Sequence, residues 1–235
     1  VIRSISSCSP PKWWRECRRS KLMRRQFLRA FTAALIAIVP GLARAQSLDE
    51  LLKAVNAGDA KTVGAFLNKG LDPDTADPDG NTILMIAARL GHQDVVALLI
   101  SRKAGVARRS PHGDTALMMA CLKGHLAIAK LLVGNGAQIS QSGWAPLHYA
   151  AFEGRTEVIR YLLEKGAEKD APGPNGFTAL MLAARGGHIE TARLLLYEDA
   201  DLTVRGPKGE TALGIARERK NQELVDLLRR AGAAY

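Results

Sequence analysis

The side chains best suited to chemistry in this sequence are five histidines: His92, His112, His125, His148 and His188. Imidazole is a common zinc ligand and a proton carrier near neutral pH. His92, His125 and His188 each follow a glycine, and their separations of 33 and 63 residues indicate the same place in successive structural units. Helical units stack about 8–10 Å apart, whereas zinc ligands lie about 2.0–2.3 Å from one metal. We therefore expect each ring to pack within its own unit, and we predict no metal site and no cofactor.

Cysteine chemistry is restricted to one residue if residues 1–45 are a removable leader. Cys8 and Cys17 lie in that leader, so the remaining chain carries Cys121 alone and forms no internal disulfide. Cys121 lies where related segments carry alanine, which predicts a buried and unreactive thiol. No serine or cysteine lies beside a base in a recognisable motif, and no glycine-rich phosphate loop follows a strand. We therefore predict that the protein has no catalytic residues and is not an enzyme.

Four aspartates, Asp72, Asp74, Asp77 and Asp79, could supply oxygen ligands for calcium. An EF-hand loop also requires glycine at its sixth place and glutamate at its twelfth. Counted from Asp72, these places hold Asp77 and Ile83, so the pattern fails. Together with the neighbouring prolines and Gly80, the aspartates indicate turns instead.

The elements that position these residues are short helices, best seen in residues 143–167. The spacing predicts one helix over Pro146–Phe152, because proline suits the first helical turn. It predicts a second over Thr156–Glu164, with an apolar stripe. Gly154 and Gly166 are suited to end them. Helices this short cannot stand alone in water, so they need neighbours.

The same pattern recurs along the chain. The first-helix leucine is separated from its next copy by 33, 30, 33 and 33 residues, and the turn is held by a glycine in four copies and by Asn221 in the last. A fixed period near 33 residues with two helices per unit is typical of a solenoid. The leucines are Leu84, Leu117, Leu147, Leu180 and Leu213, and the glycines are Gly91, Gly124, Gly154 and Gly187.

These units resemble the ankyrin repeat over roughly residues 48–235. The helix starts match the family's Thr-Pro-Leu-His motif at Gly80–Leu84, Asp114–Leu117, Ala145–His148, Phe177–Leu180 and Glu210–Leu213. The turns match its Gly-His motif at Gly91-His92, Gly124-His125 and Gly187-His188. The resemblance implies an all-α solenoid of stacked helix-turn-helix units with projecting hairpins. It also implies that His148 is structural.

The resemblance divides the chain into repeats and caps. We expect an N-terminal capping repeat over 46–76, with Ser47 capping its first helix, and a C-terminal capping repeat over 206–235. Between the caps, residues 77–205 are expected to form four repeats: 77–109, 110–141, 142–171 and 172–205. The hairpin that enters the third repeat is three residues shorter than its sisters, so its tip should be set back.

Residues 23–45 have the parts of a bacterial export signal. Arginines follow Met23, residues 30–42 are apolar, and Ala43-Arg44-Ala45 is a small-x-small cleavage site. Arg24–Arg29 resembles the twin-arginine motif, so we favour that route over general secretion and expect a periplasmic protein. The apolar segment spans roughly 20 Å as a helix, short of the ~30 Å hydrocarbon core, so no stable membrane insertion is expected after cleavage. The alternative is a cytosolic protein with an arginine-rich start.

Residues 1–22 show no periodicity. We expect them either to precede the true start at Met23 or to form a disordered basic tail. The formal net charge of +10 is concentrated in the leader, because residues 1–45 hold ten Lys or Arg and one acid. The other 190 residues hold 23 bases and 22 acids, so we expect no nucleic-acid binding.

In ankyrin proteins the concave side, formed by hairpins and first helices, usually binds another protein. The matching positions here predict an aromatic patch on adjacent repeats, with a leucine and arginines at its edge. Trp and Arg are typical hot-spot residues, although such aromatics could instead pack the hairpin bases. The predicted partner-binding residues are Trp144, Phe152, Phe177, Arg185, Arg89 and Leu122.

We therefore predict a monomeric, non-enzymatic protein–protein interaction module of the bacterial periplasm. Its partner would be a periplasmic protein, and one role would be to support a periplasmic enzyme. One alternative is a structural or envelope-stress scaffold without a dedicated partner. The other is an enzyme of unrecognised type, which would retain a metal or ligand on purification.

Overall fold

Threonine caps and left-handed glycines divide the chain into short helices. The fold is known from a computed structural model that describes residues 40–233, with side chains from residue 47. The described residues form helices and no strand, apart from an isolated antiparallel bridge between Ala76 and Thr82. The helices are α3 (Pro40–Ala57), α4 (Ala60–Asn68), α5 (Ile83–Leu90), α6 (Gln93–Ser101), α7 (Ala116–Lys123), α8 (Leu126–Gly134), α9 (Pro146–Phe152), α10 (Thr156–Glu164), α11 (Ala179–Gly186), α12 (Ile189–Tyr197), α13 (Ala212–Glu218) and α14 (Gln222–Arg230).

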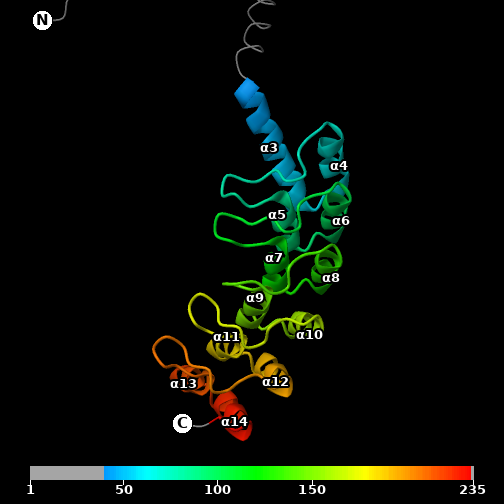
Figure 1. Cartoon of the computed structure of the whole chain (residues 1–235). Helices are drawn as coiled ribbons and strands as arrows, with labels where there is room; N and C mark the ends of the chain where they lie inside the picture. The colour runs from blue at the N-terminus through cyan, green and yellow to red at the C-terminus, as the bar shows by residue number, and fades with distance from the viewer. Residues whose placement is uncertain (1–39, 234–235) are drawn as a thin grey trace, which may run out of the picture. The chain divides into compact units, whose positions relative to one another are not determined.

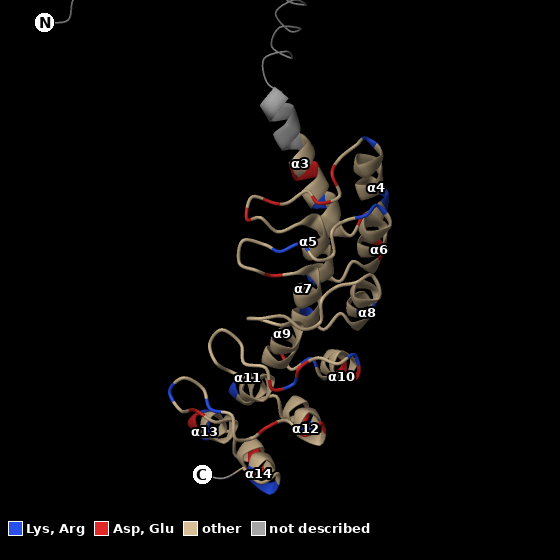
Figure 2. Cartoon of the chain, viewed as in Figure 1, with Lys and Arg blue, Asp and Glu red and all other residues tan. Residues whose placement is uncertain are grey.

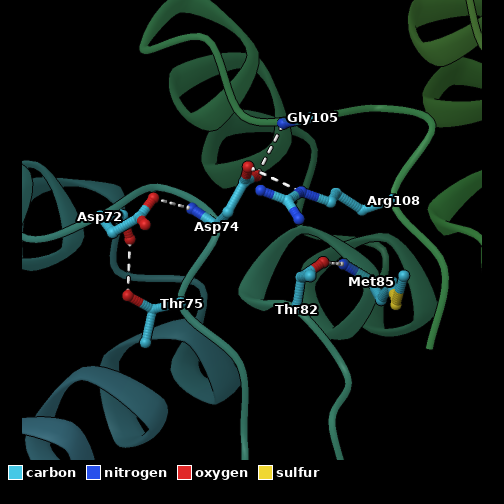
Figure 3. Close-up of polar contacts among 7 residues, drawn as sticks. All are labelled: Asp72, Asp74, Thr75, Thr82, Met85, Gly105 and Arg108. Atoms are coloured by element: carbon cyan, nitrogen blue, oxygen red, sulfur yellow. Dashed lines mark hydrogen bonds and ion pairs between the residues drawn. The ribbon is translucent and has the colours of Figure 1, made fainter. Parts of the chain in front are cut away.

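The bounds of α9 and α10 confirm the two helices predicted from the spacing of residues 143–167. Most first helices begin with a threonine whose hydroxyl accepts a backbone N–H three residues on, as Thr82 does from Met85 at 3.3 Å (Figure 3). This bond satisfies one of the N–H groups that a helix start leaves unpaired. The other three such threonines are Thr115, Thr178 and Thr211.

The helices of residues 51–235 stack in two rows, which confirms the predicted all-α ankyrin solenoid. An inner row consists of α5, α7, α9, α11 and α13, each packed on the next, and an outer row consists of α4, α6, α8, α10, α12 and α14. Loops project beside the inner row, on the side away from the outer helices (Figure 1). The helix pairs α5–α6, α7–α8, α9–α10 and α11–α12 lie within residues 77–109, 110–141, 142–171 and 172–205.

The core between the two rows consists of aliphatic side chains and small residues. The five first-helix leucines are at most 2% exposed, and alanines allow the inner helices to approach closely. Cys121 is fully buried among them. This confirms the expected burial of Cys121, and burial raises the pKa of its thiol well above the ordinary value, which disfavours the reactive thiolate.

The aspartates before α5 serve as turn and inter-repeat acceptors. The Asp74 carboxylate accepts the Gly105 N–H at 2.7 Å and the Arg108 Nε–H at 3.0 Å, which joins one repeat to the next (Figure 3). Asp72 accepts the Asp74 N–H at 2.8 Å. No group of three or more His, Cys, Asp or Glu side chains that could hold a metal occurs in the described part of the chain.

The Gly-His histidines were wrongly expected to pack within their own repeats. His125 instead lies on the glycine of the preceding repeat: a Cβ added to Gly91 would lie 2.6 Å from its ring. Its Nε2–H donates to the Arg89 carbonyl at 3.2 Å. His92 reaches back to Asn56, and His188 to Phe152, in the same way. The reason is the left-handed glycine that ends the preceding first helix. It leaves a helix carbonyl unpaired and, because it has no side chain, leaves space for the ring.

Two substitutions of the Gly-His turn show how strongly its geometry is required. In the third repeat, Arg155 takes the place of histidine, covers Gly124 and donates from Nε to the Leu122 carbonyl at 3.2 Å. In the last repeat the glycine's place is held by Lys220, which has a φ of 56°. The prediction that Asn221 holds that place is wrong, because Asn221 instead caps α14 by accepting the Leu224 N–H at 3.1 Å.

The chain divides into two units, residues 1–50 and 51–235. The predicted cap at Ser47 is wrong, because α3 already begins at Pro40, where proline suits a first turn. Residues 1–22 and residues 23–39 of the predicted export signal lie outside the described residues. Within the described part, no helix is both long and apolar enough to span a bilayer.

Candidate functional site

The site is built around the short loop that precedes α9. Four sister loops are closed by a pair of backbone hydrogen bonds: Asp77 N–H to Asn81 O, Ser110 N–H to Asp114 O, Gly173 N–H to Phe177 O and Gly206 N–H to Glu210 O, each followed by a bond from a glycine N–H. The loop before α9 is three residues too short for this pair. Its replacement is the Gln141 side chain, whose Nε2–H donates to the Trp144 carbonyl at 2.6 Å.

Gln141 is itself held from the preceding repeat. The Arg109 guanidinium donates to its Oε1 at 2.6 Å. Arg109, Gln141 and Trp144 therefore form a continuous chain of hydrogen bonds across the repeat boundary. This chain fixes the backbone of Trp144, whose side chain is only half-buried.

The Trp144 ring stands edge-on to two side chains of α9. Its centroid lies 5.7 Å from that of His148 and 6.2 Å from that of Tyr149, with interplanar angles of 84° and 75°. Its other edge lies against Gly173 of the next loop, where an added Cβ would be 3.1 Å away. Edge-to-face contacts of this kind are favourable, so the ring is held by contacts on two sides.

Tyr149 connects the site to the previous repeat. Its hydroxyl donates to the Asp114 carboxylate. Burial, together with this carboxylate, raises the pKa of Tyr149 above its ordinary value, so the hydroxyl stays protonated as a donor. Sister repeats carry Ile86, Met119, Leu182 and Ile215 at the same place. Tyr149 was not among the predicted site residues, although a tyrosine at a place that is otherwise aliphatic could have indicated it.

An open, mainly apolar cavity of about 260 Å³ lies between α7, α9 and the loop before α9. Five side chains line it: Leu122, Trp144, His148, Tyr149 and Phe152. Phe152 is 49% exposed, although it is a large apolar side chain. An apolar cavity of about 150 Å³ accepts a benzene-sized group, so this one has room for a bulky side chain. Below, this set of five is called the aromatic cavity.

The structure brings together only part of the predicted aromatic patch. Trp144, Phe152 and Leu122 share the aromatic cavity, whereas Phe177 and Arg185 line a second cavity between α11 and α13. The Phe177 ring lies against Gly206, and the Arg185 guanidinium lies 5.9 Å from the centroid of that ring. The two aromatics therefore line cavities at different repeat boundaries.

Arg89 lies outside both cavities, near the C-terminal end of α5, and is exposed. Its carbonyl accepts the His125 bond, while its guanidinium has no hydrogen-bond or ion-pair partner among the described residues. The binding role assigned to these six residues stays a prediction. Lys, Arg, Asp and Glu are distributed over all the repeats and do not form one basic stripe (Figure 2).

His148 lines the aromatic cavity and is 2% exposed. Its Nδ1 accepts the Ala145 N–H at 3.1 Å, so Nε2 carries the proton and donates to the Ala171 carbonyl at 2.9 Å. Burial lowers the pKa of this ring, and a doubly protonated ring could no longer accept from Ala145. His148 is therefore a neutral link between its own helix start and the next loop.

We expect His148 to make the protein less stable as the pH falls below about 6.5, the ordinary histidine pKa. The unfolded chain takes up a proton there while native His148 does not, which favours unfolding by at most about 1.4 kcal/mol per pH unit. In urea titrations from pH 8 to 5, His148→Gln should be less stable than wild type, and the gap should narrow below pH 6.5. Parallel curves over the whole range would contradict this assignment.

Comparison with known proteins identifies the class. Three overlapping segments, residues 51–142, 104–173 and 168–235, match the ankyrin repeats. They cover more than half of the chain, so the protein belongs to the ankyrin-repeat family.

Curated relatives include mammalian proteins. Protein phosphatase 1 regulatory subunit 27 of Mus musculus is 39% identical over 126 residues, which is 53% of this chain and 62% of the relative. Its Homo sapiens counterpart is 40% identical over 126 residues, with the same coverage. Ankyrin repeat and SAM domain-containing protein 6 of Mus musculus is 32% identical over 101 residues, 43% of this chain and 8% of the relative. The chain thus matches less than two thirds of each relative's length.

Proposed function

We propose that this protein is a non-enzymatic interaction module that binds a partner protein through the aromatic cavity on its inner helices. The observation that carries the proposal is Phe152, an aromatic side chain left 49% exposed beside a half-buried Trp144. Exposed large apolar groups around a preformed apolar hollow are typical of binding surfaces. Arg89 and Arg185 lie on the repeats at either side and would take part at its edge.

Two further observations support a binding role over a catalytic one. The mouse and human relatives are named as regulatory subunits of a phosphatase, so their names describe proteins that act with another protein. In this chain the titratable groups at the cavity are engaged in structural bonds: Tyr149 to Asp114, and His148 to Ala145 and Ala171. They are thereby committed to holding the repeats together.

The location proposed for this interaction is the bacterial periplasm, after export by the twin-arginine route. The support is the order of arginines, apolar residues and Ala43-Arg44-Ala45 in residues 23–45. The partner would then be a periplasmic protein, and an enzyme that needs support before or after export fits this setting.

The test is affinity capture with the full chain as bait, run in parallel on periplasmic and cytosolic extracts. The wild type is expected to retain a defined protein from the periplasmic extract, and the double variant Trp144→Ala/Phe152→Ala is expected to lose it. A central aromatic hot spot contributes about 2 kcal/mol or more, so each substitution should weaken binding at least about thirtyfold.

The matched control is Tyr197→Ala, which removes an aromatic ring that is 82% exposed on α12, away from the cavity. It should retain the partner. Thermal unfolding of all three proteins shows whether the double variant is still folded. Equal capture by the wild type and a folded double variant would refute the site, and capture only from the cytosolic extract would refute the location.

A further inference from the structure

The aromatic cavity lies in the middle of a row of equivalent positions on the inner helices. The residue five positions after the first-helix leucine is Arg89 in α5, Leu122 in α7, Phe152 in α9 and Arg185 in α11. Leu122 and Phe152 line the cavity, and the two arginines lie one repeat beyond it on either side. Glu218 holds the same position in α13, so the positive charge ends at α11.

The two arginines of this row offer exposed positive charge to a ligand on both sides of the aromatic cavity. At the aromatic cavity, Glu153 pairs with Arg155 at 3.4 Å and Asp114 accepts the Tyr149 hydroxyl. Beside Arg185, Glu210 accepts the Lys208 N–H at 2.8 Å, and Glu218 lines the same cavity as Arg185 without an ion pair to it among the described residues. Arg89 and Arg185 are exposed and have no ion-pair partner among the described residues. Basic residues near a helix C-terminus also favour the helix dipole, but this effect uses no side-chain partner.

From this pattern we propose that the row binds an extended protein segment with one bulky apolar side chain flanked on both sides by acidic residues. The inference rests on the proposed function and specifies the partner's chemistry. The apolar side chain enters the aromatic cavity, and the two carboxylates meet Arg89 and Arg185. Arginine suits this role because its planar guanidinium binds a carboxylate through two parallel hydrogen bonds.

The spacing in the segment follows from the fold. Three steps between neighbouring inner helices separate Arg89 from Arg185, and each step is about 8–10 Å. An extended chain advances about 3.3 Å per residue, so roughly eight residues bridge the two arginines. The acidic residues therefore lie about four positions before and about four positions after the apolar residue.

The experiment uses the full chain and three synthetic peptides with blocked termini and a Ser-Asn background. The first peptide has a central Phe with Glu at the two predicted positions, the second has Lys in place of Glu, and the third has Ser in place of Phe. Fluorescence anisotropy at low salt should show that the first peptide binds at least about fivefold more tightly than the second. The third should bind least, and added salt should reduce the difference between the first two.

Charge reversal gives the decisive comparison. The variant Arg89→Glu/Arg185→Glu should prefer the Lys peptide, whereas the control Arg160→Glu/Arg193→Glu, with the same change in net charge on the outer helices, should keep the wild-type preference. Circular dichroism checks that both variants remain folded. Equal affinity for the Glu and Lys peptides, or a reversed variant that still prefers Glu, would overturn the inference.

Other outcomes separate this inference from the proposed function. If no peptide binds, but the Trp144-dependent partner is still captured, the segment chemistry is wrong and the binding function stands. If capture also fails, both are wrong. Sedimentation of the protein alone tests a second copy as the occupant: a dimer that Phe152→Ala dissociates would replace the acidic segment with a self-interaction.

Discussion

Replacing Leu117 with alanine is expected to lower the free energy of unfolding by about 2–5 kcal/mol. Leu117 is 0% exposed, and its helix α7 packs against both α5 and α9. Truncation removes its contacts and leaves a hollow in the middle of the stack, which the neighbouring helices cannot both close. A repeat array is stabilised largely by the interfaces between neighbouring repeats. Because the substitution weakens two of these interfaces, it lowers the stability of the whole stack.

Urea denaturation followed by circular dichroism measures this loss as a lower midpoint. The control is Leu90→Ala, which makes the same chemical change at a side chain that is 41% exposed on α5. It should change stability by less than about 1 kcal/mol. Similar losses for the two variants would mean that the inner row is not the core of this protein.

Replacing Gly91 with alanine is expected to destabilise the protein through two separate effects. The φ of 84° at Gly91 is left-handed and costs an alanine roughly 1–2 kcal/mol. The added Cβ would also lie 2.6 Å from the His125 ring, which must then move and lose its bond to the Arg89 carbonyl. That second effect adds about 1–3 kcal/mol, as overpacking does elsewhere.

Gly113→Ala separates the two effects, because Gly113 has a φ of 86° but no atom within 4 Å of an added Cβ. It should show the backbone cost alone. In a double-mutant cycle, His125→Ala should make Gly91→Ala less harmful, since the clashing ring is gone. If Gly91→Ala and Gly113→Ala cost the same, the histidine does not press on the glycine in solution.

Helix boundaries within a repeat were predictable because local residues determine them. Pro146 and the glycines around α9 and α10 act within a few residues of their own positions, so the bounds were read correctly. Ser47 failed for a related reason: it is a good cap, but the helix that contains it starts earlier, at Pro40. A cap residue marks a possible start and does not exclude an earlier one.

Side-chain directions across repeat boundaries were not predictable in the same way. The period places Trp144 and Phe177 at the same position, and both rings lie against the equivalent glycine of the next loop, Gly173 and Gly206. Yet Trp144 lines a cavity with residues of α7 and α9, whereas Phe177 lines one with residues of α11 and α13. The difference follows from the short loop before α9 and from Gln141, whose side chain donates to the Trp144 carbonyl. The repeat period does not predict this bond. For the same reason, periodicity alone gave no indication that His125 bonds to the preceding repeat.

The backward direction of these histidine contacts has a consequence for synthesis on the ribosome. Each of these rings lies on a left-handed glycine and bonds to a backbone carbonyl near it, and both precede the histidine in the chain. The bonded carbonyl lies 36 residues before its histidine for His92, His125 and His188. The glycine and the carbonyl therefore leave the ribosome before the histidine that covers them. In the order of translation, each of these three histidine contacts can therefore form as soon as its own ring has emerged and folded.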